Sequence, residues 1–279
     1  METPGPTHTA ELFSPLHTAL VGLLRGLSSD DWLRPTLAGT WLVRDIAAHL
    51  LDVDLRRLSM ARDGHRPAPA HPVSSFAEIV SLIDSQNASG VAYAARLSPR
   101  VITDLLEVSG RWISELMASL PPHEEALFPV AWAGEARSEN WMDVGREYTE
   151  RWHHQMQIRE AVGANGLLDR RWLFPALDLS VRALPRALEG VTRSPGTSVV
   201  LRVEGAGDAV WSVVQDGGRW QLWRGAPASA TTEVVCDADT AWKLFYNALP
   251  PDVARERLRV HGDGALAEVL LRARSVMVS

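Results

Sequence analysis

A carboxylate and a histidine stand four residues apart in the segment EYTERWHHQMQIREAVG, residues 147–163. If this segment is a helix, Glu150 and His154 lie on one face, because residues i and i+4 of a helix are neighbours. Carboxylate oxygen and imidazole nitrogen are donors that zinc accepts, and a catalytic zinc needs three protein ligands and an open position. The pair is therefore half of a candidate metal site, and a third ligand must come from elsewhere in the chain.

His49 is the strongest candidate for that third ligand. It lies in the apolar segment DIAAHLLDVDL, whereas four of the other eight histidines stand beside prolines or near the N-terminus. A single histidine on an apolar helix is more often a core residue with one hydrogen bond, so His49 alone does not establish a site. A divalent cation would satisfy His49, Glu150 and His154 together. We expect zinc, and nickel or iron stay open, because these ligand types do not choose among the three metals.

The adjacent residues His153 and His154 must point in different directions on a helix. The residues one turn apart through His153 are polar throughout, which predicts a strip facing water: Arg146, Thr149, Gln157 and Glu160. The strip through His154 becomes apolar toward Ile158 and Ala161, which predicts partial burial. We therefore expect His154 to point inward and His153 to point away. Taken alone, the Glu150–His154 spacing also fits an ordinary solvated helix pair.

Helical spacing of apolar residues continues through most of the first 165 residues. It is clearest in four segments before the quoted one: residues 8–27, 41–64, 76–97 and 98–120. Ser98-Pro99 marks a helix start, because proline suits the first helical turn. Gly163 or Asn165 marks the end of the helix that carries Glu150. The sequence therefore predicts a helical bundle at residues 1–165.

The pattern changes after about residue 170. A connecting helix is predicted first, and then TSVVLRVEG and DAVWSVVQDGGRWQLWRG alternate apolar and polar residues as strands do. Asp216-Gly217-Gly218 predicts a hairpin turn between two strands, and TTEVVCDAD predicts a further strand. Two segments with helical spacing follow. The sequence thus predicts a smaller α+β domain at residues 170–279, and α+β is the expected fold class of the whole chain.

Composition excludes several classes of function. The 279 residues carry a net charge of −6 without a basic block, which argues against nucleic acid as a partner. No apolar run approaches 18 residues, so we expect no membrane span. The N-terminal residues lack the basic start and apolar run of a signal peptide. The single cysteine, Cys236, excludes an intrachain disulfide and a four-thiolate zinc site, and we expect a cytoplasmic protein.

Two motifs together resemble a known family. TWLVRDIAAHL contains Trp41, Asp45 and His49, and ERWHHQMQIREAVG follows about a hundred residues later with Glu150 and His154. This arrangement resembles the mycothiol-dependent maleylpyruvate isomerase family of the DinB-like superfamily. The resemblance implies a DinB-like four-helix bundle in which His49, Glu150 and His154 hold a metal ion.

The resemblance covers nearly the whole chain. LRVHGDGALAEVLL carries the GD turn that precedes the family's last helix, and the C-terminal region resembles the family's second, sterol-carrier-like domain. One position departs from the family pattern: Gln157 stands where many relatives carry an aspartate, and a neutral amide cannot serve as a general base. Since the superfamily is functionally diverse, its fold and metal transfer more readily than its reaction.

The resemblance also implies a nucleophile from outside the protein. A bound metal would hold a thiol as thiolate, the nucleophilic form, whereas Cys236 fits a small buried residue of a predicted strand. The expected function is a metal- and mycothiol-dependent isomerase or S-transferase that acts on a small electrophilic substrate. A metal-water hydrolase and a non-catalytic metal-binding or ligand-sensing module stay open as alternatives. These patterns predict neither the individual substrate nor the catalytic residues nor the oligomeric state.

Overall fold

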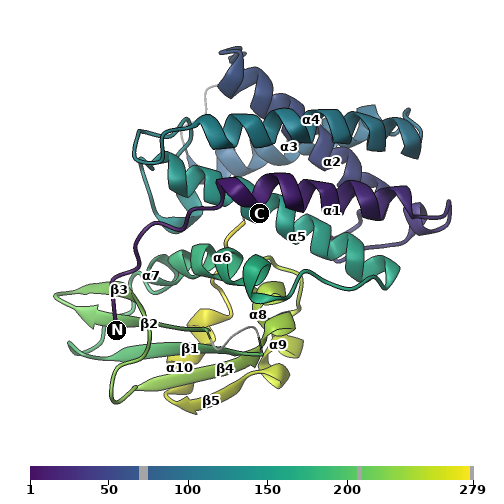
Figure 1. Ribbon diagram of the computed structural model, residues 1–279. Coiled ribbons are helices and arrows are strands. Elements are labelled where there is room, and N and C mark those ends of the chain that lie inside the picture. Colours follow the sequence, from purple (N-terminus) through teal and green to yellow (C-terminus); the bar gives the residue numbers. More distant parts are fainter. Residues whose placement is uncertain (69–74, 206–208, 277–279) are drawn as a thin grey trace. The chain divides into compact units, whose positions relative to one another are not determined.

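The computed structural model describes residues 1–68, 75–205 and 209–276. Within these residues, a helical region is followed by a region built around a five-stranded sheet (Figure 1). The predicted α+β fold class is therefore confirmed. None of the helices in the described residues is long and apolar enough to cross a membrane.

The described residues divide into two compact units. The helical unit contains residues 8–127 and 139–166, and the sheet unit contains residues 1–7, 128–138 and 167–276. Residues 1–7 and 128–138 thus group with the sheet, although they fall inside the range predicted for the helical domain. A β-bridge between Glu2 and Arg224 ties the first residues to strand β3, near which the N-terminus lies in Figure 1.

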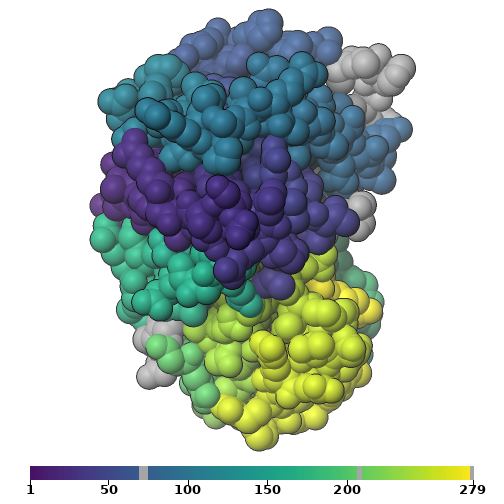
Figure 2. Space-filling model, turned by 90° about the vertical axis from the view of Figure 1, so that its right-hand side faces the viewer, coloured from purple at the N-terminus to yellow at the C-terminus, as the bar shows by residue number. Residues whose placement is uncertain are grey.

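Five long helices form the helical unit within the described residues: α1 (Phe13–Arg25), α2 (Val43–Arg57), α3 (Phe76–Ala94), α4 (Pro99–Ser119) and α5 (Asn140–Val162). The helix α2 packs against α3, α4 and α5, and α1 packs against α4 and α5. Figure 2 shows the purple N-terminal residues of this unit beside the blue residues of α4. Segments far apart in the sequence therefore share one surface.

Local sequence explains where these helices begin and end. The Ser98 hydroxyl accepts a hydrogen bond from the amide of Val101 at 3.3 Å, and Pro99 occupies the first turn of α4, as predicted. Gly163 ends α5 with a φ of 68°, a left-handed conformation that suits glycine. At the start of α2, the Asp45 carboxylate accepts from the amide of Leu42 at 3.0 Å. A short π-helical turn, η3 (Leu58–Arg62), extends α2.

The core of the helical unit lies between α1, α2, α4 and α5. Its members include Leu20 of α1, Ile46 of α2, Leu106 of α4 and Ile158 of α5, all nearly inaccessible to water. Burying a side chain of this size contributes about 1.5–3 kcal/mol. Since Ile46 and Ile158 stand one turn from His49 and His154, this core holds the two histidine-bearing segments together.

The sheet unit has the strand order β3-β2-β1-β4-β5. Its strands are β1 (Ser198–Glu204), β2 (Ala209–Asp216), β3 (Arg219–Arg224), β4 (Thr232–Asp237) and β5 (Arg259–Gly262). Strands β1 and β4 pair in parallel and the other neighbours pair antiparallel. Gly217 and Gly218 form the two-residue turn between β2 and β3, both with positive φ, which confirms the predicted hairpin.

Shorter helices accompany the sheet: η4 (Ala131–Ala133), α6 (Arg170–Ser180), η5 (Val181–Ala183), α7 (Leu184–Ala187), α8 (Ala238–Phe245), α9 (Pro251–Arg257) and α10 (Gly264–Leu270). In contact with the sheet, α7 touches β3, α8 touches β1 and β4, and α10 touches β4. The edge strand β5 is exposed along its whole length. Yellow C-terminal residues accordingly make up much of this unit's surface in Figure 2.

A buried carboxylate joins four segments of the sheet unit. Asp178 of α6 accepts hydrogen bonds from the Thr7 hydroxyl, from Trp211 Nε1 at 2.9 Å and from Arg224 Nε at 2.8 Å. Burial opposes its ionisation, but the bonds from Arg224, Thr7 and Trp211 outweigh burial and hold the pKa of Asp178 below its ordinary value. Asp178 therefore fastens the first residues of the chain and strands β2 and β3 to α6.

Candidate metal centre

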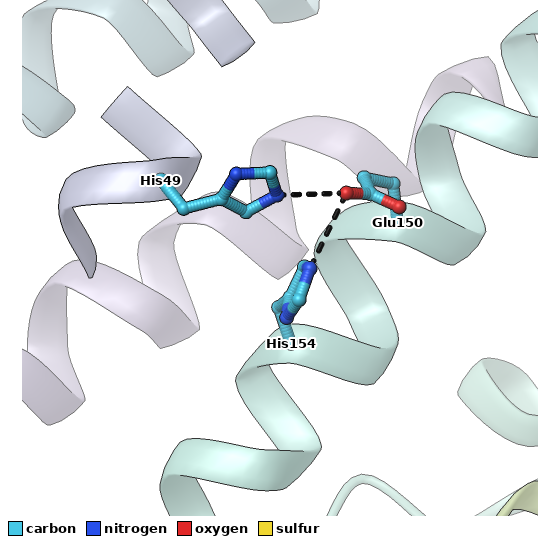
Figure 3. Close-up of side chains that lie close together, drawn as sticks. All are labelled: His49, Glu150 and His154. Carbon is cyan, nitrogen blue, oxygen red and sulfur yellow. Dashed lines mark hydrogen bonds and ion pairs between the residues drawn. The ribbon is translucent and has the colours of Figure 1, made fainter. Parts of the chain in front are cut away.

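The structure brings His49, Glu150 and His154 together (Figure 3). Glu150 Oε1 lies 2.9 Å from His49 Nε2 and 3.3 Å from His154 Nε2. The two imidazole rings have centroids 4.7 Å apart, and one ligand atom from each residue lies within 4.8 Å of the others. Atoms that bind one zinc ion at about 2.0–2.2 Å cannot be much farther apart than this.

Two buried ion pairs between α2 and α5 explain why His49 faces Glu150. Asp54 of α2 lies 2.7 Å from Arg151 of α5, and Arg57 of α2 pairs with Asp143 of α5. Residue numbers rise along α2 as they fall along α5, so the two helices run antiparallel. Because both pairs are buried and join fixed positions, they set the register that places His49 opposite Glu150.

The remaining members of this charged cluster lie on α5. Glu147 pairs with Arg146 at 2.9 Å and with Arg151 at 2.8 Å. Burial opposes its ionisation, but Arg146, Arg57 and Arg151 lower the pKa of Glu147 to about 2. The cluster thus combines three acids with three arginines and is balanced in charge. The sequence offered a signal for this cluster that was not used: acids and arginines three or four residues apart in α5.

The three converging side chains differ in exposure. His49 and His154 are 2% and 7% exposed, whereas the Glu150 side chain is 29% exposed. Burial lowers the pKa of His49 and favours its neutral form. Burial also opposes ionisation of Glu150, but His154 and His49 hold its pKa well below the ordinary value. The site therefore offers a carboxylate and a neutral imidazole, which are the forms that bind a metal ion.

The partners of the two imidazole nitrogens of His154 indicate whether a metal ion can bind there. Its Nδ1 lies 2.8 Å from Gln157 Oε1, and its Nε2 faces the Glu150 carboxylate. An amide oxygen accepts hydrogen bonds, so Nδ1 must carry a hydrogen. Nε2 can then face a carboxylate in two ways: it carries a second proton, or a cation lies between the two atoms. A divalent cation fits this arrangement of donors.

The prediction that His153 faces water is wrong. This side chain is 4% exposed, its Nδ1 bonds the carbonyl of Thr149 at 2.8 Å, and its ring centroid lies 4.0 Å from that of His154. Burial is the main cause that lowers the pKa of His153 to about 3. The middle of the polar strip, Thr149, His153 and Gln157, is buried, and Arg146 and Thr149 satisfy their polar groups within the unit. His153 is nevertheless not among the three residues that converge.

Trp41 covers one side of the two imidazoles. Its ring centroid lies 5.0 Å from that of His49 and 6.2 Å from that of His154, with which it is stacked. The indole is half-buried. Apolar cover of this kind excludes water from one side of the site and strengthens electrostatic interactions within it.

The sequence matches the model of the mycothiol maleylpyruvate isomerase N-terminal domain over residues 13–159, more than half of the chain. This range contains all three converging residues. No curated protein sequence matches the chain.

Two solved structures are similar in fold across both units. One is a crystal structure of a histidine-to-alanine mutant of the mycothiol-dependent maleylpyruvate isomerase, with 13% identity, 90% of each chain covered and a TM-score of 0.55. The other is the unmutated isomerase, with 14% identity, 84% of this chain and 86% of that chain covered, and a TM-score of 0.52. A third, titled UbiJ-SCP2 Ubiquinone synthesis protein, has a TM-score of 0.22, which supports no likeness. The predicted sterol-carrier-like character of the C-terminal domain therefore stays a prediction.

Proposed function

The chain belongs to the mycothiol-dependent maleylpyruvate isomerase family, and on that basis we propose that it is a metal- and mycothiol-dependent enzyme acting on a small electrophilic substrate. Isomerisation is the reaction we favour, with maleylpyruvate or a related electrophile as substrate. S-transfer is the second reaction we consider, because it would use the same thiol as nucleophile. The observation that carries the proposal is the convergence of His49, Glu150 and His154.

The three residues are suited to hold one divalent ion. His49 and His154 would each supply Nε2 and Glu150 would supply Oε1, a set of nitrogen and oxygen donors that zinc accepts. When bound, zinc would hold the thiol of mycothiol as thiolate, the nucleophile that an electrophilic substrate requires. Trp41 would keep water from one side, and the exposed side of Glu150 would face the incoming small molecules.

The chain's single cysteine is a poor alternative nucleophile. Cys236 lies on β4, is 2% exposed, and has its pKa raised to about 12, mainly by burial. Its thiol is therefore protonated at neutral pH, and a protonated thiol is a weak nucleophile. This supports a thiol cofactor from outside the chain. We place the reaction in the cytoplasm, where small thiols are kept reduced.

The proposal is tested by mixing zinc-loaded protein with mycothiol and a panel of electrophiles that includes maleylpyruvate. We expect turnover that requires both the thiol and the metal. Chelation should abolish this turnover, and added zinc should restore it.

The same assay separates the alternatives. Ester or amide hydrolysis without a thiol would instead support a metal-water hydrolase. Tight metal-dependent ligand binding without any turnover would support a non-catalytic sensor. Either result would overturn the proposed isomerase or S-transferase activity.

A further inference from the structure

Gln157 lies one turn after His154 on α5 and contacts the imidazole nitrogen that faces away from Glu150. Its Oε1 is 2.8 Å from His154 Nδ1, and Gln157 is only 3% exposed. Since the amide oxygen accepts a hydrogen bond, Nδ1 is the nitrogen that carries hydrogen. In neutral His154 the free lone pair is then on Nε2, the atom 3.3 Å from the Glu150 carboxylate.

His49 differs from His154 in this respect. Its Nδ1 is buried and has no hydrogen-bond partner in the described part of the chain. Its orientation depends on Glu150 at Nε2 and on packing against Trp41. In the described part of the chain, the Nδ1 of His154 is therefore held by a side chain, whereas the Nδ1 of His49 is not.

We propose that Gln157 is a positioning residue that assigns Nε2 of His154 as the metal ligand and sets how tightly the ion is held. This inference rests on the proposed metal-dependent function. Histidines that bind metals donate their other N–H to an oxygen, and loss of that partner weakens metal binding by about 10–100-fold. A neutral amide makes the imidazole less basic than a carboxylate would. The site therefore holds its ion less tightly than one with a carboxylate at this position.

Gln155 supplies a matched control on the same helix. It is also glutamine and fully buried, but neither of its amide atoms has a hydrogen-bond partner within the described residues. It lines a small cavity of about 10 Å³ together with His17, Asp54 and Arg151, and its amide makes no hydrogen bond to His154. Replacing it changes the same kind of residue in the same helix without removing a hydrogen bond from the imidazole.

The experiment measures the affinity for Zn²⁺ alone, by competition with a chromophoric chelator, in four proteins: wild type, Gln157→Leu, Gln157→Glu and Gln155→Leu. We expect Gln157→Leu to bind zinc at least about 10-fold more weakly than wild type. Gln157→Glu should bind more tightly than wild type, and Gln155→Leu should stay within about 2-fold. In zinc-loaded wild type, ¹⁵N NMR should find the hydrogen of His154 on Nδ1.

Several results would overturn the inference. Equal zinc affinity in wild type and Gln157→Leu would do so, as would a metal-bound Nδ1 in the NMR spectrum. If Gln157→Leu does not fold, the Gln157→Glu variant decides, because an affinity no higher than wild type contradicts the role. A wild-type protein that binds no zinc would overturn the proposed function as well, so the two failures are distinguishable.

Discussion

Glu150 in the helical unit and Asp178 in the sheet unit are both acids with several side-chain partners, yet they differ in what those partners can do. Asp178 is 0% exposed and receives hydrogen bonds from a hydroxyl, an indole and a guanidinium. These groups keep their hydrogens at neutral pH. Glu150 is 29% exposed on its side chain and faces two imidazoles, whose nitrogens carry either a hydrogen or a lone pair.

The helix α5 itself offers a closer comparison. Glu147 and Glu150 stand three residues apart, but Glu147 pairs with two arginines and Glu150 with two histidines. An arginine is permanently charged, so its pair is complete without a ligand. An imidazole exchanges its hydrogen for a metal ion. The chemistry of its partners therefore distinguishes an acid that can bind a metal ion from one that only forms ion pairs.

The largest expected effect is the loss of zinc when one of the three converging residues is removed. His49→Ala and His154→Ala should each abolish stoichiometric zinc binding, because two protein ligands do not make a stable zinc site. His153→Ala should retain zinc, since this residue is outside the group of three. Metal analysis after gel filtration measures both outcomes. Full zinc occupancy in His49→Ala would contradict the distinction between Glu150, which faces histidines, and the acids that form ion pairs with arginines.

Removal of Asp178 should affect stability and leave zinc binding unchanged. We expect Asp178→Ala to lower the free energy of unfolding by about 3 kcal/mol. The substitution breaks a buried ion pair and leaves several hydrogen-bond donors without an acceptor. Arg224 keeps some contact with water, which places the effect at the low end of the range for buried pairs. Urea unfolding and zinc titration of the same variant measure the two properties. If Asp178→Ala lost zinc and kept its stability, Asp178 rather than Glu150 would behave as the ligand.

Acid should weaken the helical unit before it affects the Asp178 cluster. The pKa values of His17, His49 and His153 are lowered mainly by burial, that of His153 to about 3. Below about pH 6.5 the unfolded chain therefore binds more protons than the folded one. Metal-free stability should then fall by up to about 1.4 kcal/mol per pH unit for each histidine.

The stabilisation from Asp178 is also lost on acidification, but at a lower pH than that from the histidines. Its pKa is lowered in the folded protein, so its stabilisation is present above about pH 3.9 and is lost as the pH falls through the folded value. Urea unfolding of the metal-free protein at pH 7.5, 6.5, 5.5 and 4.5 stays above the range of Asp178 and therefore measures the effect of the histidines. A stability that does not change from pH 6.5 to 4.5 would contradict the lowered histidine pKa values.

The smallest expected effect is that of replacing the single cysteine. Cys236→Ala should leave mycothiol-dependent turnover unchanged and cost about 1 kcal/mol of stability, because it removes one small buried group. The turnover of wild type and Cys236→Ala is compared at saturating mycothiol, and their stability by urea unfolding. A loss of turnover at full zinc occupancy would show that the protein itself supplies the thiol.

Several features could be predicted from the sequence because they depend on local spacing. The start of α4 at Ser98-Pro99, the end of α5 at Gly163 and the turn at Gly217-Gly218 are set by residues next to one another in the chain. Glu150 and His154 share a helix face for the same reason. The family was recognisable because two such local motifs occur about a hundred residues apart.

The burial of His153 could not be predicted in this way. Its polar neighbours at helical spacing indicated a strip facing water, but Arg146 and Thr149 find their partners inside the unit. Residues 1–7 and 128–138 likewise join the sheet unit through contacts with residues far along the chain, such as the bridge between Glu2 and Arg224. Periodicity reports which residues share a face, and it does not report what covers that face.

The sequence by itself determined the α+β class, the family and the helix face shared by Glu150 and His154, since these follow from residue types at short spacing. Only the tertiary structure decided that His49 meets this pair, through the register that Asp54–Arg151 and Arg57–Asp143 impose on two antiparallel helices. It also decided that Gln157 backs His154. The physical reason is that a shift of α2 along α5 by one turn would move His49 about 5 Å, beyond reach of a shared ion, without changing any local pattern in the sequence.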